Sequence, residues 1–201
     1  LGEPGETKDV TIELKSMADV GLVGFPSAGK SSLVSVLSAA KPKIADYPFT
    51  TLEPNLGVVQ LSGMRTFVVA DVPGIIEGAH EGRGLGLRFL RHIERTRTLA
   101  YLIPVDAEDP QEEYRLLREE LRSYSEELAE KPHCVVISKL DVLGPDEEPP
   151  RIDAPDAWGV YAISAVSRRG VPELLEALYT HVREVIEEAW EEEPEPETYR
   201  P

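Results

Sequence analysis

Eight residues near the start of the chain have the types and spacing of a phosphate-binding loop. Residues 24–31 read GFPSAGKS and match the pattern G-x-x-x-x-G-K-[ST]. The glycines let backbone N–H groups turn toward phosphate oxygens, Lys30 can reach the β- and γ-phosphates, and the Ser31 hydroxyl can ligate Mg²⁺. The motif follows an apolar run at residues 20–23 and opens a helical pattern at 29–40. This context favours phosphate binding over the alternative, a glycine turn that only caps a helix.

Two further segments carry groups suited to a bound triphosphate. The sequence DVPG at residues 71–74 ends an apolar run, so that Asp71 can hold Mg²⁺ through water and the Gly74 N–H can meet a γ-phosphate. Thr50 and Thr51 lie in a proline-bearing loop, where a hydroxyl can reach Mg²⁺ only while a γ-phosphate is present. Each signal is weak alone, because Asp-x-Pro-Gly turns are common.

A third pair of segments has the chemistry to read a guanine base. In the sequence SKLD, which follows an apolar run, Asp141 can accept hydrogen bonds from the guanine N1–H and N2–H₂ groups, which adenine lacks. The methylene stem of Lys139 can lie along the base. The Ala165 N–H, after Ser164, can meet guanine O6. Both segments follow predicted strands, and ligands bind at the carboxyl ends of strands in open α/β sheets. Two unrelated loops are the alternative.

Alternating strand and helix patterns must position these groups. Strands are predicted at residues 10–14, 20–23, 55–61, 65–70, 99–105, 134–137 and 160–163, and helices at 29–40, through 87–94, at 110–130 and at 171–189. Ser62-Gly63 predicts a hairpin turn, and residues 144–157, with four prolines, predict an excursion with at most a short helix. The alternation predicts an α/β sandwich with a mainly parallel sheet.

The composition excludes several classes of protein. The chain has 201 residues and a formal charge of -16, no apolar run approaches the roughly 18 residues that span a membrane, and the single cysteine, Cys134, excludes an internal disulfide framework. Residues 108–130 carry a net charge of -6 and residues 184–201 carry -7, which leaves -3 for the rest. This acidity argues against a broad grip on nucleic acid. Five arginines lie at positions 83–97, a stretch in which Glu94 is the one acid. They either supply charge to the active site, contact RNA or an acidic partner, or form a solvated helix face.

Two long stretches resemble a known family. Residues 41–57 (KPKIADYPFTTLEPNLG) and 71–95 (DVPGIIEGAHEGRGLGLRFLRHIER) resemble the two switch regions of the Obg family of bacterial ribosome-assembly GTPases. The resemblance covers residues 17–190 and implies a P-loop NTPase three-layer sandwich, with a mainly parallel six-stranded sheet of order 2-3-1-4-5-6 whose second strand is antiparallel. It also implies that residues 1–16 are the remnant of an N-terminal Obg domain and that 191–201 are an acidic linker.

The resemblance also implies an activity. We expect a GTPase that binds GTP or GDP with Mg²⁺, hydrolyses GTP slowly, responds to (p)ppGpp and acts in the bacterial cytoplasm on the large ribosomal subunit, largely through domains outside this sequence. The isolated domain is expected to be a monomer. Motifs and resemblance together predict these nucleotide-binding residues: Gly24, Phe25, Pro26, Ser27, Ala28, Gly29, Lys30, Ser31, Ser32, Phe49, Thr50, Thr51, Asp71, Val72, Pro73, Gly74, Ser138, Lys139, Asp141, Ser164, Ala165 and Val166. Of these, Lys30, Thr51 and Gly74 are expected to be catalytic. Ser31, Thr51 and Asp71 are expected to hold Mg²⁺.

Three departures from related GTPases refine these expectations. Ile75 stands where Ras-like enzymes place a water-orienting glutamine, which predicts slow hydrolysis and keeps a non-hydrolysing GTP-binding module open as an alternative. Ser138 stands where asparagine is usual, which predicts the loss of one bridge to the phosphate loop and weaker affinity with guanine specificity retained. Ser27 replaces the asparagine of potassium-stimulated relatives, which argues against potassium activation. A P-loop kinase, the other alternative, would need a second substrate pocket.

Overall fold

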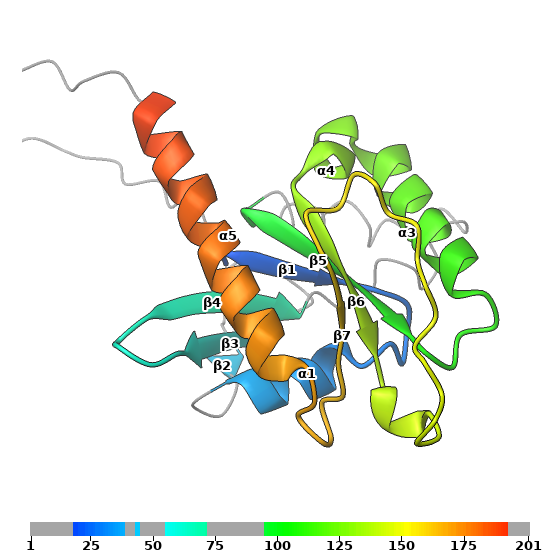
Figure 1. Cartoon of the computed structure of the whole chain (residues 1–201). Helices are drawn as coiled ribbons and strands as arrows, with labels where there is room; N and C mark the ends of the chain where they lie inside the picture. Colours follow the sequence, from blue (N-terminus) through cyan, green and yellow to red (C-terminus); the bar gives the residue numbers. More distant parts are fainter. Residues whose placement is uncertain (1–17, 39–42, 45–54, 72–94, 193–201) are drawn as a thin grey trace, which may run out of the picture.

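A computed structural model describes residues 18–38, 43–44, 55–71 and 95–192 (Figure 1). The strand predicted at residues 10–14, the helix predicted through 87–94 and most of the arginine-rich stretch lie outside these residues. In the described part of the chain, no helix is long and apolar enough to cross a membrane.

A single twisted sheet forms the centre of the molecule. Its strands are β1 (Val20–Val23), β2 (Lys43–Ile44), β3 (Asn55–Gln60), β4 (Thr66–Asp71), β5 (Thr98–Pro104), β6 (His133–Ser138) and β7 (Val160–Ala162), in the order β2-β3-β4-β1-β5-β6-β7. Strand β3 pairs antiparallel with β2 and β4, and the other pairs are parallel. The predicted order 2-3-1-4-5-6 with an antiparallel second strand is therefore confirmed. Strand β2 adds a two-residue edge within a segment that the sequence predicts to be a loop.

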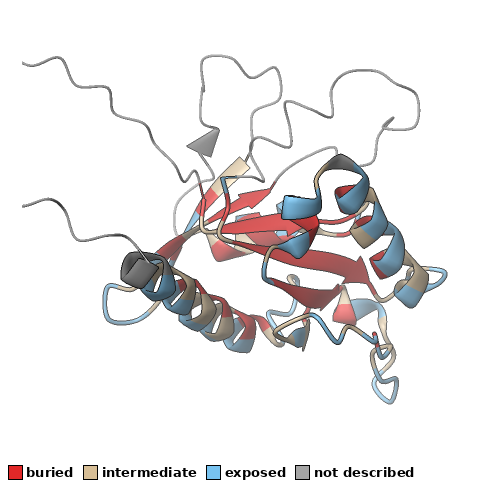
Figure 2. Cartoon of the chain, turned by 90° about the horizontal axis from the view of Figure 1, so that it is seen from above, coloured by how far each residue is buried: buried red, intermediate tan, exposed pale blue. Residues whose placement is uncertain are grey.

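Helices cover the two faces of this sheet (Figure 1). They are α1 (Lys30–Leu37), α3 (Pro110–Tyr124), α4 (Glu126–Glu130) and α5 (Val171–Glu192), with a 3₁₀ turn at Leu140–Val142. One buried cluster joins α3 and α4 to one face, and a second joins α1 and α5 to the other. Strands β1, β5 and β6 are buried along their whole length, as expected for parallel strands covered on both sides (Figure 2). The α/β sandwich predicted from the sequence is confirmed.

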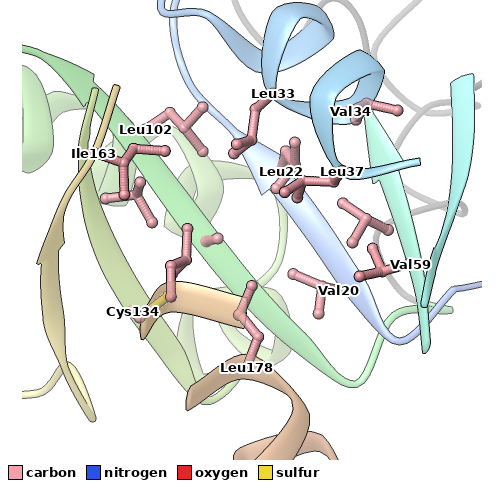
Figure 3. Packing of buried hydrophobic residues seen from close by; sticks show 14 of the residues in the cluster. Val20, Leu22, Leu33, Val34, Leu37, Val59, Leu102, Cys134, Ile163 and Leu178 are labelled. Carbon is pink, nitrogen blue, oxygen red and sulfur yellow. The ribbon is translucent and has the colours of Figure 1, made fainter. Parts of the chain in front are cut away.

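The cluster beneath α1 and α5 fixes the strand that carries the phosphate loop. Leu22 of β1 and Leu33 of α1 lie in the same buried group as Leu178 of α5 (Figure 3). Gly57 of β3 allows a close approach here, because a Cβ at this position would lie 2.9 Å from the Val34 side chain. Cys134 of β6 is buried in the same cluster, and burial raises the pKa of its thiol.

The helix predicted at residues 110–130 is broken in the structure, which corrects that prediction. Ser125 has φ -157° and separates α3 from α4. Its hydroxyl accepts a hydrogen bond from the Leu128 N–H at 3.4 Å and so caps the second helix. A serine side chain can hydrogen-bond backbone groups and so end one helix and begin another. The apolar residues continue through Leu121 and Leu128 at helical spacing, so the hydrophobic pattern does not show the break. At the C-terminal end, α5 reaches Glu192, three residues beyond the predicted boundary.

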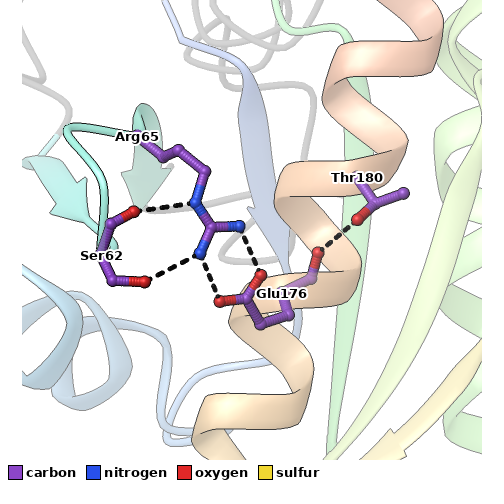
Figure 4. A network of polar contacts seen from close by, with 4 residues as sticks. All are labelled: Ser62, Arg65, Glu176 and Thr180. Carbon is purple, nitrogen blue, oxygen red and sulfur yellow. Dashed lines mark hydrogen bonds and ion pairs between the residues drawn. The ribbon is translucent and has the colours of Figure 1, made fainter.

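Polar contacts fasten the β3–β4 hairpin to α5 (Figure 4). Its turn contains Gly63 and Met64, both with left-handed backbone angles, as in tight hairpins. The Arg65 guanidinium donates to the Ser62 carbonyl at 2.9 Å and binds both carboxylate oxygens of Glu176, at 2.7 and 2.8 Å. It also lies 5.1 Å from the Tyr179 ring centroid. We call Arg65 and Glu176 the hairpin clamp.

Candidate nucleotide site

The loop between β1 and α1 has the backbone that its sequence pattern predicts. A Cβ at Gly24 would lie 2.8 Å from the Leu102 carbonyl oxygen, so glycine is required where the loop leaves the sheet. Ser27 and Gly29 both have positive φ, at 65° and 95°, and the second is the N-cap of α1. The Lys30 ammonium donates to the carbonyls of Gly24 at 2.7 Å and Phe25 at 3.1 Å. The lysine is therefore folded over the loop, at the N-terminus of a helix whose dipole favours anions.

Ser31 and Asp71 meet beside this loop. The Ser31 hydroxyl donates to Asp71 Oδ2 at 2.5 Å. Asp71 ends β4, is 2% exposed and is the register partner of Leu22 on β1. Its other carboxylate oxygen, Oδ1, is buried and has no hydrogen-bond partner among the described residues.

These two groups fit a Mg²⁺ ion that also binds phosphate. Mg²⁺ is usually held by one or two carboxylates, substrate phosphates and water rather than by a cage of protein ligands. A serine hydroxyl next to a carboxylate with an unpartnered buried oxygen suits that requirement. No cluster of three or more His, Cys, Asp or Glu residues that could hold a metal is found in the described ranges. Thr51, the third predicted ligand, lies outside them.

The residues predicted to read guanine follow β6 and β7. The buried Ser164 hydroxyl donates to Asp141 Oδ1 at 2.5 Å and accepts from the Ser167 N–H at 2.9 Å. Lys139 has φ 61°, and its ammonium lies 3.0 Å from both carboxylate oxygens of Asp106. Sequence reasoning missed these contacts: Ser164 is predicted there as a nucleotide-binding residue, without its bond to Asp141, and Asp106 is not named at all. Neither has a local sequence signal, since each contact joins the ends of two neighbouring strands.

Asp106 also acts on a neighbouring carboxylate. Glu113, on α3, has its pKa raised first by burial and then by the negative charge of Asp106, while Lys139 opposes the shift. Helix α3 therefore brings a second acidic group, Glu113, within electrostatic reach of Asp106 and the Lys139 ammonium.

Ser138 joins the two halves of the site. Its hydroxyl donates to the carbonyl of Ala28, in the phosphate loop, at 2.7 Å, and the side chain is 5% exposed. The expectation that serine at this position loses the bridge to the loop is therefore wrong. Strand β6 brings residue 138 close enough for the shorter side chain to span the gap.

A concave pocket of about 360 Å³ gathers most of these groups. Its walls are formed by Ser27, Gly29, Lys30, Ser31, Ser32, Leu33, Leu102, Ser138, Lys139, Asp141, Ile163, Ala165 and Val166. Leu33, Leu102 and Ile163 add an apolar floor that sequence reasoning did not include. Six predicted residues do not line the pocket: Gly24, Phe25, Pro26, Ala28, Asp71 and Ser164. All of them except Pro26 are hydrogen-bonded to a residue that does.

Several predicted groups lie outside the described residues. These are Phe49, Thr50, Thr51, Val72, Pro73, Gly74 and Ile75, together with Arg83, Arg88 and Arg91 of the arginine-rich stretch. At the end of that stretch, Arg97 pairs with Asp19 at 3.3 Å, which ties the start of β5 to the start of β1. This arginine therefore has a structural role.

Comparisons with known proteins place this chain among GTPases. The family model described as "50S ribosome-binding GTPase" matches residues 19–139. GTPase Obg of Salinibacter ruber is 56% identical over 186 residues, which cover 90% of this chain and 55% of that protein. GTPase Obg of Corynebacterium urealyticum is 54% identical, with 98% and 42% covered. The chain thus spans about half the length of the curated relatives it matches.

Solved structures show the same fold. Era, in complex with MgGDPNP and a segment of 16S ribosomal RNA, superimposes with a TM-score of 0.62 at 25% identity, covering 92% of this chain and 59% of that one. The cytosolic domain of the T. maritima FeoB iron transporter in its GMPPNP form gives 0.62 at 22% identity, with 83% and 64% covered. The family match covers more than half of the chain, and the Obg relatives cover nearly all of it. The chain belongs to the 50S ribosome-binding GTPase family and carries an Obg-like GTPase domain.

Proposed function

We propose that this domain binds GTP and GDP with Mg²⁺, hydrolyses GTP slowly and uses the two nucleotide states as a switch. The observation that carries the proposal is the bond between Ser138 and the Ala28 carbonyl, which holds the base-reading and phosphate-reading residues in one pocket. A phosphate loop alone is common to many nucleotide enzymes. Joined to Asp141, it favours a guanine nucleotide.

Each end of the pocket has a distinct chemical task. Lys30 and the backbone N–H groups of the loop stabilise negative charge on the phosphates, and this charge is spread over the γ-phosphoryl oxygens in the transition state. Ser31 and Asp71 are the described residues that would hold Mg²⁺, which when bound neutralises charge on the β- and γ-phosphates. Asp141 accepts hydrogen bonds from guanine and rejects adenine, whose edge leaves the carboxylate without donors.

The switch and the attacking water depend on residues beyond the described ranges. We propose that Thr51 completes the Mg²⁺ site and that the Gly74 N–H meets the γ-phosphate, so that hydrolysis releases both segments. Ile75 cannot hydrogen-bond water. Turnover by this domain alone is therefore expected to be slow, and a partner or another group is expected to position the water.

The partner that we propose is the large ribosomal subunit, in the bacterial cytoplasm. The family description and the Obg relatives support this partner. Because the chain spans about half of those relatives, contacts with the subunit are proposed to lie largely in other domains. Regulation by (p)ppGpp and a monomeric state of the isolated domain belong to the same proposal.

Single-turnover hydrolysis tests the activity. We expect bound GTP to decay faster on the domain than in buffer, ATP to bind poorly, and large ribosomal subunits to change the rate. Lys30→Ala is the control for decay that does not depend on the site. GTP decay no faster than in buffer would instead support a non-hydrolysing module, and phosphoryl transfer to an acceptor other than water would support a kinase.

A further inference from the structure

The ammonium of Lys139 is held at one defined place on the rim of the pocket. Its nitrogen lies 3.0 Å from each carboxylate oxygen of Asp106. Asp106 follows β5 on a turn that is itself fixed, because the Val105 N–H donates to the Ser138 carbonyl at 3.0 Å and the Ala107 N–H donates to the Pro104 carbonyl at 3.1 Å. The turn that carries the carboxylate is thus bonded to the residue that precedes Lys139.

The two ends of the Lys139 side chain are therefore both anchored. Its backbone has φ 61°, an uncommon angle for a residue with a side chain, and this angle sets the direction of the Cα–Cβ bond. A lysine stem has several rotatable bonds and by itself samples many conformations. Fixing its far end on Asp106 confines the stem to the wall of the pocket that it lines.

The anchor also keeps two charges of the same pocket apart. Asp141 lines this pocket two residues beyond Lys139, and the Ser164 hydroxyl already occupies its Oδ1 atom. An ammonium released from Asp106 would be attracted to the Asp141 carboxylate and would compete with the guanine N–H donors. The Lys139 and Asp106 side chains are 30% and 44% exposed. Ion pairs this exposed contribute little to folding stability, so a gain in stability does not explain why this pair is present.

We propose that Asp106 is a positioning residue of the guanine site. It holds the Lys139 stem in place to cover one face of the base and keeps the Lys139 ammonium away from Asp141. This inference rests on the proposed function, since it assumes that the pocket binds a guanine nucleotide. Asp106 itself need not touch the nucleotide, because it acts through Lys139.

The test measures GDP and ADP affinity for the wild-type domain, Asp106→Asn, Lys139→Ala and the double variant. We expect Asp106→Asn to weaken GDP binding by about three- to tenfold and to lower the preference for GDP over ADP. In the Lys139→Ala background the same substitution should change neither quantity. Glu108→Gln is the matched control, because it removes an exposed carboxylate two residues away, and it should leave GDP affinity within about twofold.

Two outcomes would overturn the inference. One is a loss in Asp106→Asn no larger than that in Glu108→Gln. The other is a loss that persists in full without Lys139, which would show that Asp106 only stabilises its turn. Thermal unfolding of each nucleotide-free variant separates misfolding from loss of binding, and Asp106→Glu should restore part of the GDP preference. A wild-type domain that binds GDP no better than ADP would refute the proposed function itself before any variant is compared.

Discussion

The two ends of the pocket, which we propose bind phosphate and guanine, are built in different ways, and we call them the phosphate end and the guanine end. The phosphate end is a backbone structure, in which Gly24 and Gly29 shape a loop and a few charged or hydroxyl groups stand beside it. At the guanine end, side chains following β6 and β7 hold one another, as in the bond from Ser164 to Asp141. On the proposed function, charge at the first end would supply affinity for any triphosphate, whereas fixed hydrogen-bond acceptors at the second end would supply selectivity. Variants at the two ends should therefore fail in different ways.

Removal of the phosphate-loop ammonium is expected to have the largest effect. Lys30→Ala should lower GTP affinity and turnover by about 100-fold or more, because one charged donor to the phosphates is lost. GTP and ATP affinity should fall together, since this residue does not touch the base. Equilibrium binding of both nucleotides measures this, and a loss confined to GTP would contradict the division between the two ends.

Ser31→Ala is expected to act through the metal. It removes the hydroxyl beside Asp71, so GTP affinity in Mg²⁺ should fall by about tenfold or more. In excess EDTA the variant and the wild type should bind equally. Ser35→Ala, one turn along α1, is the control because its hydroxyl donates to the Ser31 backbone carbonyl instead. Equal losses with and without Mg²⁺ would place Ser31 outside the metal site.

Ser138→Ala cuts the connection between the two ends. It removes one buried hydrogen bond and leaves the Ala28 carbonyl without this donor, at a cost of about 1 kcal/mol in stability and a few-fold in GDP affinity. Selectivity for guanine should survive, because Asp141 and Ser164 are intact. Thermal unfolding and GDP titration measure the two effects. A variant as stable and as tight-binding as the wild type would show that the bridge contributes nothing.

The hairpin clamp is expected to affect neither end, and its effect should be the smallest. The hydrogen bond to Arg65 lowers the pKa of Glu176 below its ordinary 4.5. A lowered folded pKa means that this stabilisation is present above pH 4.5 and is lost as pH falls through the folded value. Glu176→Gln should therefore lower the unfolding temperature slightly at pH 7, and the difference should disappear in acid and in high salt.

Two measurements complete the test of the clamp. GDP affinity should stay unchanged in Glu176→Gln, and Glu188→Gln, an exposed position on the same helix, should leave the unfolding temperature unchanged at both pH values. A loss of GDP affinity in Glu176→Gln would show that the hairpin and the pocket are coupled through α5.

The parts of the site that the sequence predicts are those with local signals. The phosphate loop is a contiguous pattern between a strand and a helix, and residues 138–141 follow an apolar strand, so both could be located before the fold was known. Contacts between strand ends have no such signal, which is why the roles of Asp106 and Ser164 emerge only from the structure. The expectation that Ser138 loses the bridge to the phosphate loop rested on the lengths of the serine and asparagine side chains. It did not include the distance between residue 138 and the loop, which only the structure gives.

The fold shows the same division. Apolar runs and their alternation with helical patterns predict the strands and an α/β sandwich, because buried parallel strands are short and hydrophobic. The order of the strands follows from the resemblance to the Obg family and not from these patterns. The break at Ser125 is decided by one side-chain hydrogen bond inside a continuous apolar stripe, and β2 is a two-residue edge whose pairing depends on the neighbouring β3. Neither leaves a periodic pattern long enough to detect.

Nucleotide competition on Asp141→Asn tests the central claim most directly, namely that this pocket selects guanine through one carboxylate. The Asp141 carboxylate can only accept hydrogen bonds, whereas an asparagine side chain at this position also offers an N–H donor. Xanthine has a carbonyl oxygen, O2, where guanine has its N2 amine, so the new donor suits xanthine. We predict that the variant loses its preference for GDP and gains affinity for xanthosine diphosphate, while its phosphate loop still binds. Unchanged selectivity for GDP over xanthosine diphosphate would contradict the assignment of Asp141 and, with it, the guanine site.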